Sequence, residues 1–494
     1  IQGASSSVGK SLLVTALCRI FARRGQKVAP IKAQNMSNNA AVCPDGSEIG
    51  RAQALQAYAA GTLLSSDLNP ILVKPEADAH SQIIVNGRPF KSLSAYDYYK
   101  YKQVLWEHAT AALDRLRAQN DLVIIEGAGS PAELNLKRGD IVNMAVARYA
   151  NSPVVLAGDI DRGGIFAQLL GTLWLLEPEE RQLVRGFLVN KFRGDIRLFE
   201  EGVRILEEKS ALPVLGVIPY LKNLNLPEED AVALDGQEGA LHNDSVIDIV
   251  VIHLPVIANF DDFDPFRNDA GVRVRYVTRP FEIGRTQAII LPGTKSTMAD
   301  LAWLRENGFD EVIREHIRRG GALVGICGGY QMLGKTIHDP EHVESSSDHI
   351  DGLGFLPTET AFISEKATYQ VHARVTERIA WLAGLSECEL QGYEIHIGRT
   401  DSASTWLKID TRNGVPCEFS DGSITADGRV WGCYLHGLFG NTAFRHAWLT
   451  SLGWVPGSQS LAHQEQLEKS LDDLADKVEA AVDIHKIERI VWAD

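Results

Sequence analysis

Residues 3–11 read GASSSVGKS, and this stretch decides the fold of the first half of the chain. It fits the phosphate-loop pattern, in which a small residue and four further residues precede Gly-Lys-Ser, and a helix-like run follows at once. In such a loop, backbone N–H groups approach phosphate oxygens, the lysine adds a positive charge and the serine hydroxyl can ligate Mg²⁺. The sequence therefore predicts a nucleotide site at Ser7, Val8, Gly9, Lys10 and Ser11.

Short apolar runs alternate with helix-like segments from this loop to about residue 220. The runs are KVAPIKA (27–33), DLVIIEGAG (121–129), SPVVLAGDI (152–160), VRGFLVNKF (184–192) and LPVLGVIPY (212–220). Runs of this kind are typical of strands buried on both faces, so we predict a parallel sheet in a doubly wound α/β domain. A phosphate loop normally follows such a strand, yet only two residues precede Gly3, so we expect the natural chain to begin a few residues earlier.

Acidic and amide side chains at other positions are candidates for the same site. Glu126 ends a buried run before a glycine turn, so it can hold the cation, directly or through water, or merely cap the turn. Glu48, in DGSEIGRAQA (45–54), is a second candidate for that ion beside Ser11. Asn190, followed by Lys191 at another strand end, can contact the edge of adenine or lie in an ordinary loop.

A second alternating region follows a polar, acidic stretch at 222–246 that Pro and Gly interrupt. Its predicted strands are IDIVVIHLP (247–255), VRVRYVT (272–278), QAIILPG (287–293) and GGALVGIC (320–327), with antiparallel strands between about 350 and 435. The predicted organisation is a phosphate-loop domain at 1–235, a linker at 236–246, a second doubly wound α/β domain at 247–450, and a helical tail at 451–494 with a solvated charged face.

Composition limits the class of protein. With 494 residues, 45% of them hydrophobic, the chain is long enough for several globular domains. Its net charge of −15 argues against a nucleic-acid partner, because such partners require a basic surface. The longest apolar run, at 247–258, is too short to span a membrane, and six cysteines without a CxxC pair suit a reducing compartment. We expect a cytoplasmic protein with small-molecule ligands.

The segment GICGGYQ (325–331) places a cysteine among glycines, after an apolar run and before a helix-like run. This is the arrangement of a nucleophile elbow, which holds the side chain on a strained bend. A buried core cysteine is the alternative, but it explains none of the glycines. A thiolate nucleophile needs an imidazole within reach, and His436 follows an apolar strand at the same predicted sheet edge. We predict that Cys327 and His436 form a catalytic pair, with backbone N–H groups at Gly293 and Gly328 as an oxyanion hole.

The segment from 247 to about 448 resembles the class I glutamine amidotransferase domain, with GICGGYQMLG (325–334) as the nucleophile motif. The resemblance implies that Cys327 releases ammonia from glutamine through a thioester and that His436 is the general base. Members of that family commonly read His-Pro-Glu, with the glutamate orienting the imidazole, whereas this chain reads HGLF. If an acid orients His436, Glu394 in GYEIHIG is the candidate.

The first half resembles the dethiobiotin synthetase group of phosphate-loop ligases through GASSSVGKS and EGAG. In this order the two halves are similar to the cobyric acid synthase family over nearly the whole chain. The most specific segments are KAQNMSNNA (32–40), EIGRAQALQA (48–57), GDIDRGGIFAQL (158–169) and GYEIHIGRT (392–400). The resemblance implies amidation of the b, d, e and g carboxylates of adenosylcobyrinic acid a,c-diamide, with glutamine, ATP and Mg²⁺, in cobalamin synthesis.

A polycarboxylate substrate needs cations and amide donors near the phosphate loop. The alternative is that the amide side chains near the loop only cap turns and that the nearby arginines are exposed to solvent. Two further functions stay open: amidation of the a and c carboxylates of cobyrinic acid, and a nucleotide-switched protein similar to partitioning ATPases, with an inactive docking domain. The QNMSNN block argues against the first, and the intact cysteine and histidine against the second. The predicted substrate-binding residues are Lys32, Gln34, Asn35, Asn38, Arg51 and Arg162.

Overall fold

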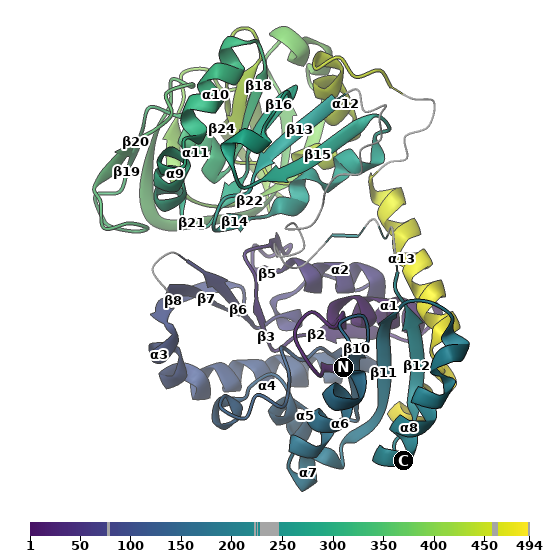
Figure 1. Cartoon of the computed structure of the whole chain (residues 1–494). Coiled ribbons are helices and arrows are strands. Elements are labelled where there is room, and N and C mark those ends of the chain that lie inside the picture. Colours follow the sequence, from purple (N-terminus) through teal and green to yellow (C-terminus); the bar gives the residue numbers. More distant parts are fainter. Residues whose placement is uncertain (77–79, 222–223, 225, 228–246, 457–462, 493–494) are drawn as a thin grey trace.

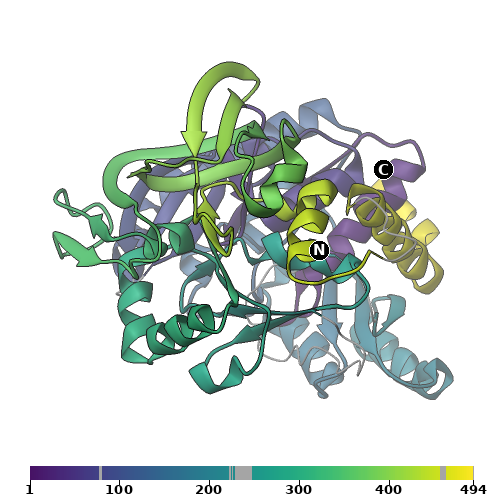
Figure 2. The same ribbon diagram turned by 90° about the horizontal axis from the view of Figure 1, so that it is seen from above.

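The structure is a computed structural model, and it describes residues 1–76, 80–221, 224, 226–227, 247–456 and 463–492. Two α/β domains lie one above the other, and the last helices of the chain run along the side of the N-terminal domain (Figure 1). The view from above looks through the second domain onto the first (Figure 2). The predicted linker at 236–246 lies outside the described residues.

The N-terminal domain is built on the predicted parallel sheet. Strand β2 (Val28–Ile31) pairs with β9 (Leu122–Ile125), and β1 (Gln2–Gly3), β10 (Val154–Asp159), β11 (Val184–Phe192) and β12 (Val214–Pro219) pair in that order. Backbone hydrogen bonds of Ile1 with Ile125 and Gly127, at 2.7 and 2.9 Å, join the two sets. The six strands therefore act as one sheet, with β1 and the phosphate loop at its centre.

Helices cover both faces of this sheet, as the apolar runs predict. Ala157 and Leu188 pack in one core with α1 (Lys10–Arg23) and α2 (Arg51–Ala60). Their strand neighbours Leu156 and Val189 point to the other face and pack with α5 (Met144–Ala150), α6 (Ile165–Leu175) and α8 (Glu200–Ser210). Helix α4 (Lys102–Gln119) covers the end of the sheet near β2 and β9. The doubly wound fold is confirmed.

An insertion between β2 and β9 forms a second, smaller unit that the sequence did not predict. Strands β3 (Gln34–Met36), β6 (Ile71–Pro75), β7 (His80–Val85) and β8 (Arg88–Ser94) make a four-stranded sheet, and β4 (Ala40–Val42) and β5 (Glu48–Gly50) make a short hairpin. Strands β3, β4 and β5 have only three residues each and carry little periodicity, so pattern alone cannot find these three. The insertion faces the second domain, and Ala40, Val42 and Leu72 share an apolar cluster with Tyr393 and Ile395 of that domain.

The second domain combines a parallel sheet with an antiparallel one. The first has the order β15 (Val272–Val277), β13 (Ile247–Ile252), β16 (Ala288–Leu291), β18 (Ala322–Ile326), β26 (Val430–Cys433) and β25 (Ser423–Ile424), in which only the last pairing is antiparallel. The second is centred on β21 (Glu359–Val375), β22 (Glu389–Asp401) and β23 (Leu407–Arg412). It is completed by β19 (Thr336–His338), β20 (His349–Asp351) and β24 (Val415–Asp421). The predicted parallel core and the antiparallel strands after 350 are both present.

The C-terminal tail returns to the N-terminal domain. Helices α13 (His463–Ala481) and α14 (Ile484–Trp492) place apolar side chains in the core beside α1. Arg19 and Arg23 of α1, and Arg24 directly after it, pair with acids of the tail, for example Arg19 with Asp472 at 2.8 Å. The charged face of the tail is partly exposed to solvent, as predicted, and it also meets counter-charges from the N-terminal domain that the tail sequence alone does not reveal.

Candidate functional site

The phosphate loop between β1 and α1 has the predicted shape. Ser7 has φ +58° and Gly9 has φ +95°, so the chain turns in the left-handed region just before α1 begins. The Lys10 ammonium donates to the backbone oxygens of Ser5 and Gly129, at 3.3 and 3.0 Å, which keeps it beside the loop. The start of α1 then presents the N–H groups that bind phosphate.

Two side chains from the end of β11 hold the backbone of this loop. Asn190 donates its amide to the Val8 oxygen at 2.7 Å, and Lys191 donates to the Ser7 oxygen at 2.6 Å. Lys191 also pairs with the buried Asp159 at 2.9 Å. Contact of Asn190 with adenine stays a prediction. Sequence reasoning missed Asp159, although it ends a buried strand just as Glu126 does.

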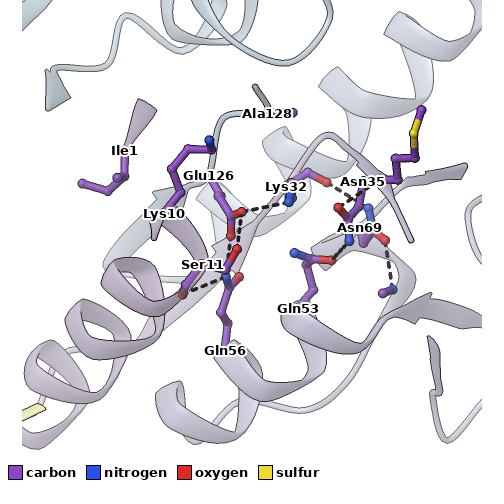
Figure 3. Close-up of polar contacts among 12 residues, drawn as sticks. Ile1, Lys10, Ser11, Lys32, Asn35, Gln53, Gln56, Asn69, Glu126 and Ala128 are labelled. Carbon is purple, nitrogen blue, oxygen red and sulfur yellow. Dashed lines mark hydrogen bonds and ion pairs between the residues drawn. The ribbon is translucent and has the colours of Figure 1, made fainter. Parts of the chain in front are cut away.

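Glu126 lies at the centre of a polar network beside the loop (Figure 3). Its fully buried carboxylate accepts hydrogen bonds from Ser11 Oγ at 2.9 Å and Gln56 Nε2 at 2.5 Å, and pairs with Lys32 Nζ at 2.8 Å. Ser11 and Glu126 thus bring two hard oxygen donors together, which fits the preference of Mg²⁺. The structure therefore brings these two predicted metal ligands within hydrogen-bonding distance of each other.

A cavity of about 1340 Å³ joins the phosphate loop to the predicted substrate residues. Of those residues Lys32, Gln34, Asn35 and Arg162 line it. Among the described residues, its basic side chains are Lys10, Lys32, Lys102, Lys137, Arg162, Lys191 and Arg193, and its acidic ones are Glu126, Glu133, Asp140 and Glu180. In this described lining the basic side chains outnumber the acidic ones although the whole chain carries −15, so the cavity suits a polyanionic ligand.

Glu48, the second predicted metal ligand, lies elsewhere. Its buried carboxylate pairs with Lys74 of its own domain and with Lys366 of the second domain. Burial alone would raise the pKa of Glu48, but the two ammonium groups outweigh burial and lower that pKa to about 2. The prediction that Glu48 holds the cation with Ser11 is wrong, because its oxygens are used in the interface between the domains.

Two predicted substrate residues also lie outside the described lining of the cavity. Arg51 pairs with Asp261 of the second domain and donates to the Tyr393 hydroxyl at 3.1 Å. Asn38 lies half-buried between β3 and β4. The structure therefore places Arg51 and Asn38 by the domain interface, and the prediction that they contact the substrate is not supported.

Cys327 stands on a strained turn between β18 and α11 (Gly328–Leu333). Its φ of +53° and ψ of −112° are rare for a residue with a side chain. A Cβ on Gly329 would lie 2.0 Å from the carbonyl oxygen of Leu291, so only glycine fits where α11 meets the neighbouring strand. The glycines around the cysteine thus have the geometric reason that the elbow motif predicts.

His436 meets this thiol from the end of β26, and a buried aspartate orients it. Its imidazole contacts Cys327, and its Nδ1 lies 2.7 Å from Oδ2 of Asp262. Burial alone would lower the pKa of His436, but Asp262 and Cys327 outweigh burial and raise it to about 10. The arrangement favours an imidazolium beside the Cys327 thiol, where it can donate a proton to a leaving group.

Asp262, and not Glu394, is the acid of this site. Glu394 is buried, but its carboxylate is bound by Arg412 at 2.8 and 2.9 Å. Asp262 lies in the 3₁₀ segment Phe260–Asn268 and also accepts the Gly437 N–H at 2.8 Å. The only sequence signal was the acidic pair in ANFDDFD, which follows a buried strand.

The two predicted oxyanion glycines flank the catalytic pair. Gly328 is the first residue of α11, directly after Cys327. A Cβ on Gly293 would lie 2.9 Å from Cε1 of His436, so that backbone approaches the imidazole closely. This placement supports an oxyanion hole, which stays a prediction.

Comparison with known proteins supports the domain type predicted for each half of the chain. Residues 1–232 match the family model of the CobQ/CobB/MinD/ParA nucleotide binding domain, and residues 248–444 match that of the CobB/CobQ-like glutamine amidotransferase domain. Cobyric acid synthases of Roseiflexus castenholzii and Chloroflexus aurantiacus are each 56% identical, over 98% and 99% of this chain and 96% and 98% of their own. The chain belongs to the cobyric acid synthase family. A relative in Dehalococcoides mccartyi is 50% identical over 99% of this chain and 98% of its own.

Membership of the cobyric acid synthase family makes the protein a glutamine-dependent, ATP-driven ligase of cobalamin biosynthesis that acts on small molecules. The predicted architecture, a phosphate-loop domain followed by an amidotransferase domain, is confirmed. In the part of the chain that the structure describes, no helix is long and apolar enough to cross a membrane.

Proposed function

We propose that the protein amidates the b, d, e and g carboxylates of adenosylcobyrinic acid a,c-diamide, with nitrogen from glutamine and with ATP as the activating nucleotide. The observation that carries the proposal is the large basic cavity, in which the phosphate loop meets Gln34 and Asn35 of the QNMSNN block. A corrin ring with several carboxylates needs both that volume and that charge. Family membership supports the same choice.

The thiol site supplies ammonia in this scheme. The Cys327 thiolate attacks the amide carbon of glutamine, and the backbone N–H groups at Gly293 and Gly328 stabilise the oxyanion. The C–N bond breaks as His436 protonates the leaving nitrogen, which leaves a thioester. Water then cleaves the thioester, with His436 accepting a proton, and releases glutamate. Asp262 stabilises the imidazolium in both steps.

The nucleotide site activates the carboxylate. Transfer of the γ-phosphoryl group of ATP to a substrate carboxylate forms an acyl phosphate and ADP, and attack by ammonia then expels phosphate. Lys10 and the N–H groups at the start of α1 hold the phosphates during transfer. Ser11 and Glu126 would hold Mg²⁺, which neutralises charge on the phosphates when bound.

Mass spectrometry of the corrinoid product tests the proposal. The enzyme is incubated with glutamine, ATP and Mg²⁺, and either cobyrinic acid a,c-diamide or cobyrinic acid is added in its adenosylated form. We expect four successive conversions of carboxyl to amide on the a,c-diamide. Conversion of two carboxyls on cobyrinic acid, with the a,c-diamide left unchanged, would instead establish the a and c carboxylates as the substrate groups.

A further inference from the structure

Helix α2 of the N-terminal domain begins against the amidotransferase site. Arg51, its first residue, pairs with Asp261 and donates to the Tyr393 hydroxyl at 3.1 Å, with its guanidinium carbon 5.4 Å from the centre of the Tyr393 ring. Only 18% of the Arg51 side chain is exposed, so the charge is enclosed by the second domain. In Figure 1, α2 and β5 accordingly lie on the side of the N-terminal domain that faces β14 (Ile257–Ala258) and β22.

Both partners of Arg51 adjoin the catalytic histidine. Asp261 precedes Asp262, whose carboxylate lies on Nδ1 of His436. Tyr393 stacks on the imidazole, with ring centres 5.2 Å apart and planes inclined by 17°, and exchanges two backbone hydrogen bonds with His436. One guanidinium of the nucleotide-binding domain therefore contacts Tyr393, which stacks on His436, and Asp261, which directly precedes the aspartate that orients His436.

The same helix reaches the nucleotide site through another side chain. Gln56 donates to Glu126 at 2.5 Å and lies 3.4 Å from the Ser11 backbone oxygen. Residues 51 and 56 are separated by roughly 7.5 Å along a helix axis, at about 1.5 Å per residue. Because less than one and a half turns of helix, at about 3.6 residues per turn, join them, a shift of Glu126 or Ser11 on nucleotide binding would displace Arg51 as part of the same rigid element.

A second contact of the N-terminal domain converges on His436. The Ala40 N–H donates to Oδ1 of Asn259 at 2.9 Å, and Nδ2 of Asn259 lies 3.3 Å from Nε2 of His436. The Arg51 N–H donates to the Asn39 oxygen at 3.1 Å, so this segment and the start of α2 are fixed to each other. The QNMSNNA segment thus ends at the thiol site, although it begins in the substrate cavity.

We propose that α2 couples the two sites and that Arg51 is a positioning residue for glutamine hydrolysis, which aligns His436 when the nucleotide site is filled. Arg51 acts through Asp261 and Tyr393 and touches no substrate. The proposal rests on the glutamine-dependent ligase activity of the family and not on which corrin carboxylates react.

Glutamate release by the whole enzyme, with and without ATP, Mg²⁺ and the corrinoid, tests the coupling in Arg51→Met. We expect the stimulation by ATP and corrinoid to fall about 5- to 30-fold through kcat, with KM for glutamine within about twofold of wild type. Amidation fed with ammonium chloride should stay within about twofold of wild type, because Arg51 lies outside the described lining of the corrinoid cavity.

Two further variants separate coupling from folding. Arg51→Met leaves Asp261 buried without its partner, so Arg51→Met with Asp261→Asn removes both charges and should fold while its stimulation stays low. Arg115→Met breaks an exposed pair with Asp67 and should leave stimulation unchanged. Arg51→Lys should recover part of the stimulation, because the lysine keeps a positive charge beside Asp261.

Three results would overturn the proposal. Full stimulation in the folded double variant would show that Arg51 does not transmit the state of the nucleotide site. Loss of ammonia-fed amidation together with a higher KM for the corrinoid would assign Arg51 to substrate binding. An equal rate of glutamate release by wild type with and without ATP and corrinoid would show that the two sites are not coupled. Failure of the carboxylate assignment alone appears only in the product masses, so the two failures are distinguishable.

Discussion

The nucleotide site takes its phosphate-binding groups from one stretch of nine residues, whereas the thiol site gathers Cys327, His436 and Asp262 from three separate stretches, the last two 174 residues apart. The first site depends on the backbone of a loop, which local sequence can specify. The second depends on side chains that meet only because the fold brings the ends of β18 and β26 and the 3₁₀ segment Phe260–Asn268 together. The comparison teaches that a motif locates a nucleophile but not the residues that activate it.

Lys10→Met should give the largest loss, because it removes the charge that the loop places on the phosphates. We expect amidation to fall about 10³-fold with either glutamine or ammonia as nitrogen donor. Lys209→Met, on the exposed face of α8, is the matched control. Retention of ammonia-fed amidation in Lys10→Met would show that carboxylate activation does not use this loop.

Asp262→Asn should affect the thiol site alone. Glutamine-dependent kcat/KM should drop on the order of 10²-fold, with ammonia-fed amidation unchanged. The carboxylate of Asp262 raises the pKa of His436, so its removal should lower that pKa. The alkaline limb of the pH profile of glutamine-dependent activity, where the imidazolium loses its proton, should therefore move to lower pH. Glu394→Gln serves as the comparison, and an equal loss there would return the orienting role to Glu394.

Exchanging each of the two predicted acidic metal ligands for glutamine should distinguish the role of Glu126 from that of Glu48. Glu126→Gln should raise the Mg²⁺ concentration for half-maximal ADP release about 10-fold. Glu48→Gln should leave that value unchanged but lower the free energy of unfolding by roughly 3 kcal/mol, because Lys74 and Lys366 lose a buried carboxylate. A shifted Mg²⁺ requirement in Glu48→Gln, measured beside its thermal unfolding, would contradict the structural assignment.

The same contrast explains what the sequence could predict. The phosphate loop, the buried strands and the cysteine elbow each follow from residues that are neighbours in the chain, so their patterns sufficed. Asp262 could not be chosen from sequence, because several acids follow strands and only the fold brings this one to Nδ1 of His436. Arg51 and Glu48 were assigned to ligands because their partners, Asp261 and Lys366, belong to the other domain. Contacts between domains carry no local signature.

The most direct test of the account is the product of Cys327→Ala, identified by mass spectrometry after incubation with cobyrinic acid a,c-diamide, ATP and Mg²⁺. One sample receives glutamine and the other receives ammonium chloride. The account predicts no amide with glutamine and the full series of amides with ammonia, because the nucleotide site activates carboxylates by itself. Amides formed from glutamine, or none formed from ammonia, would contradict the division of the reaction between these two sites.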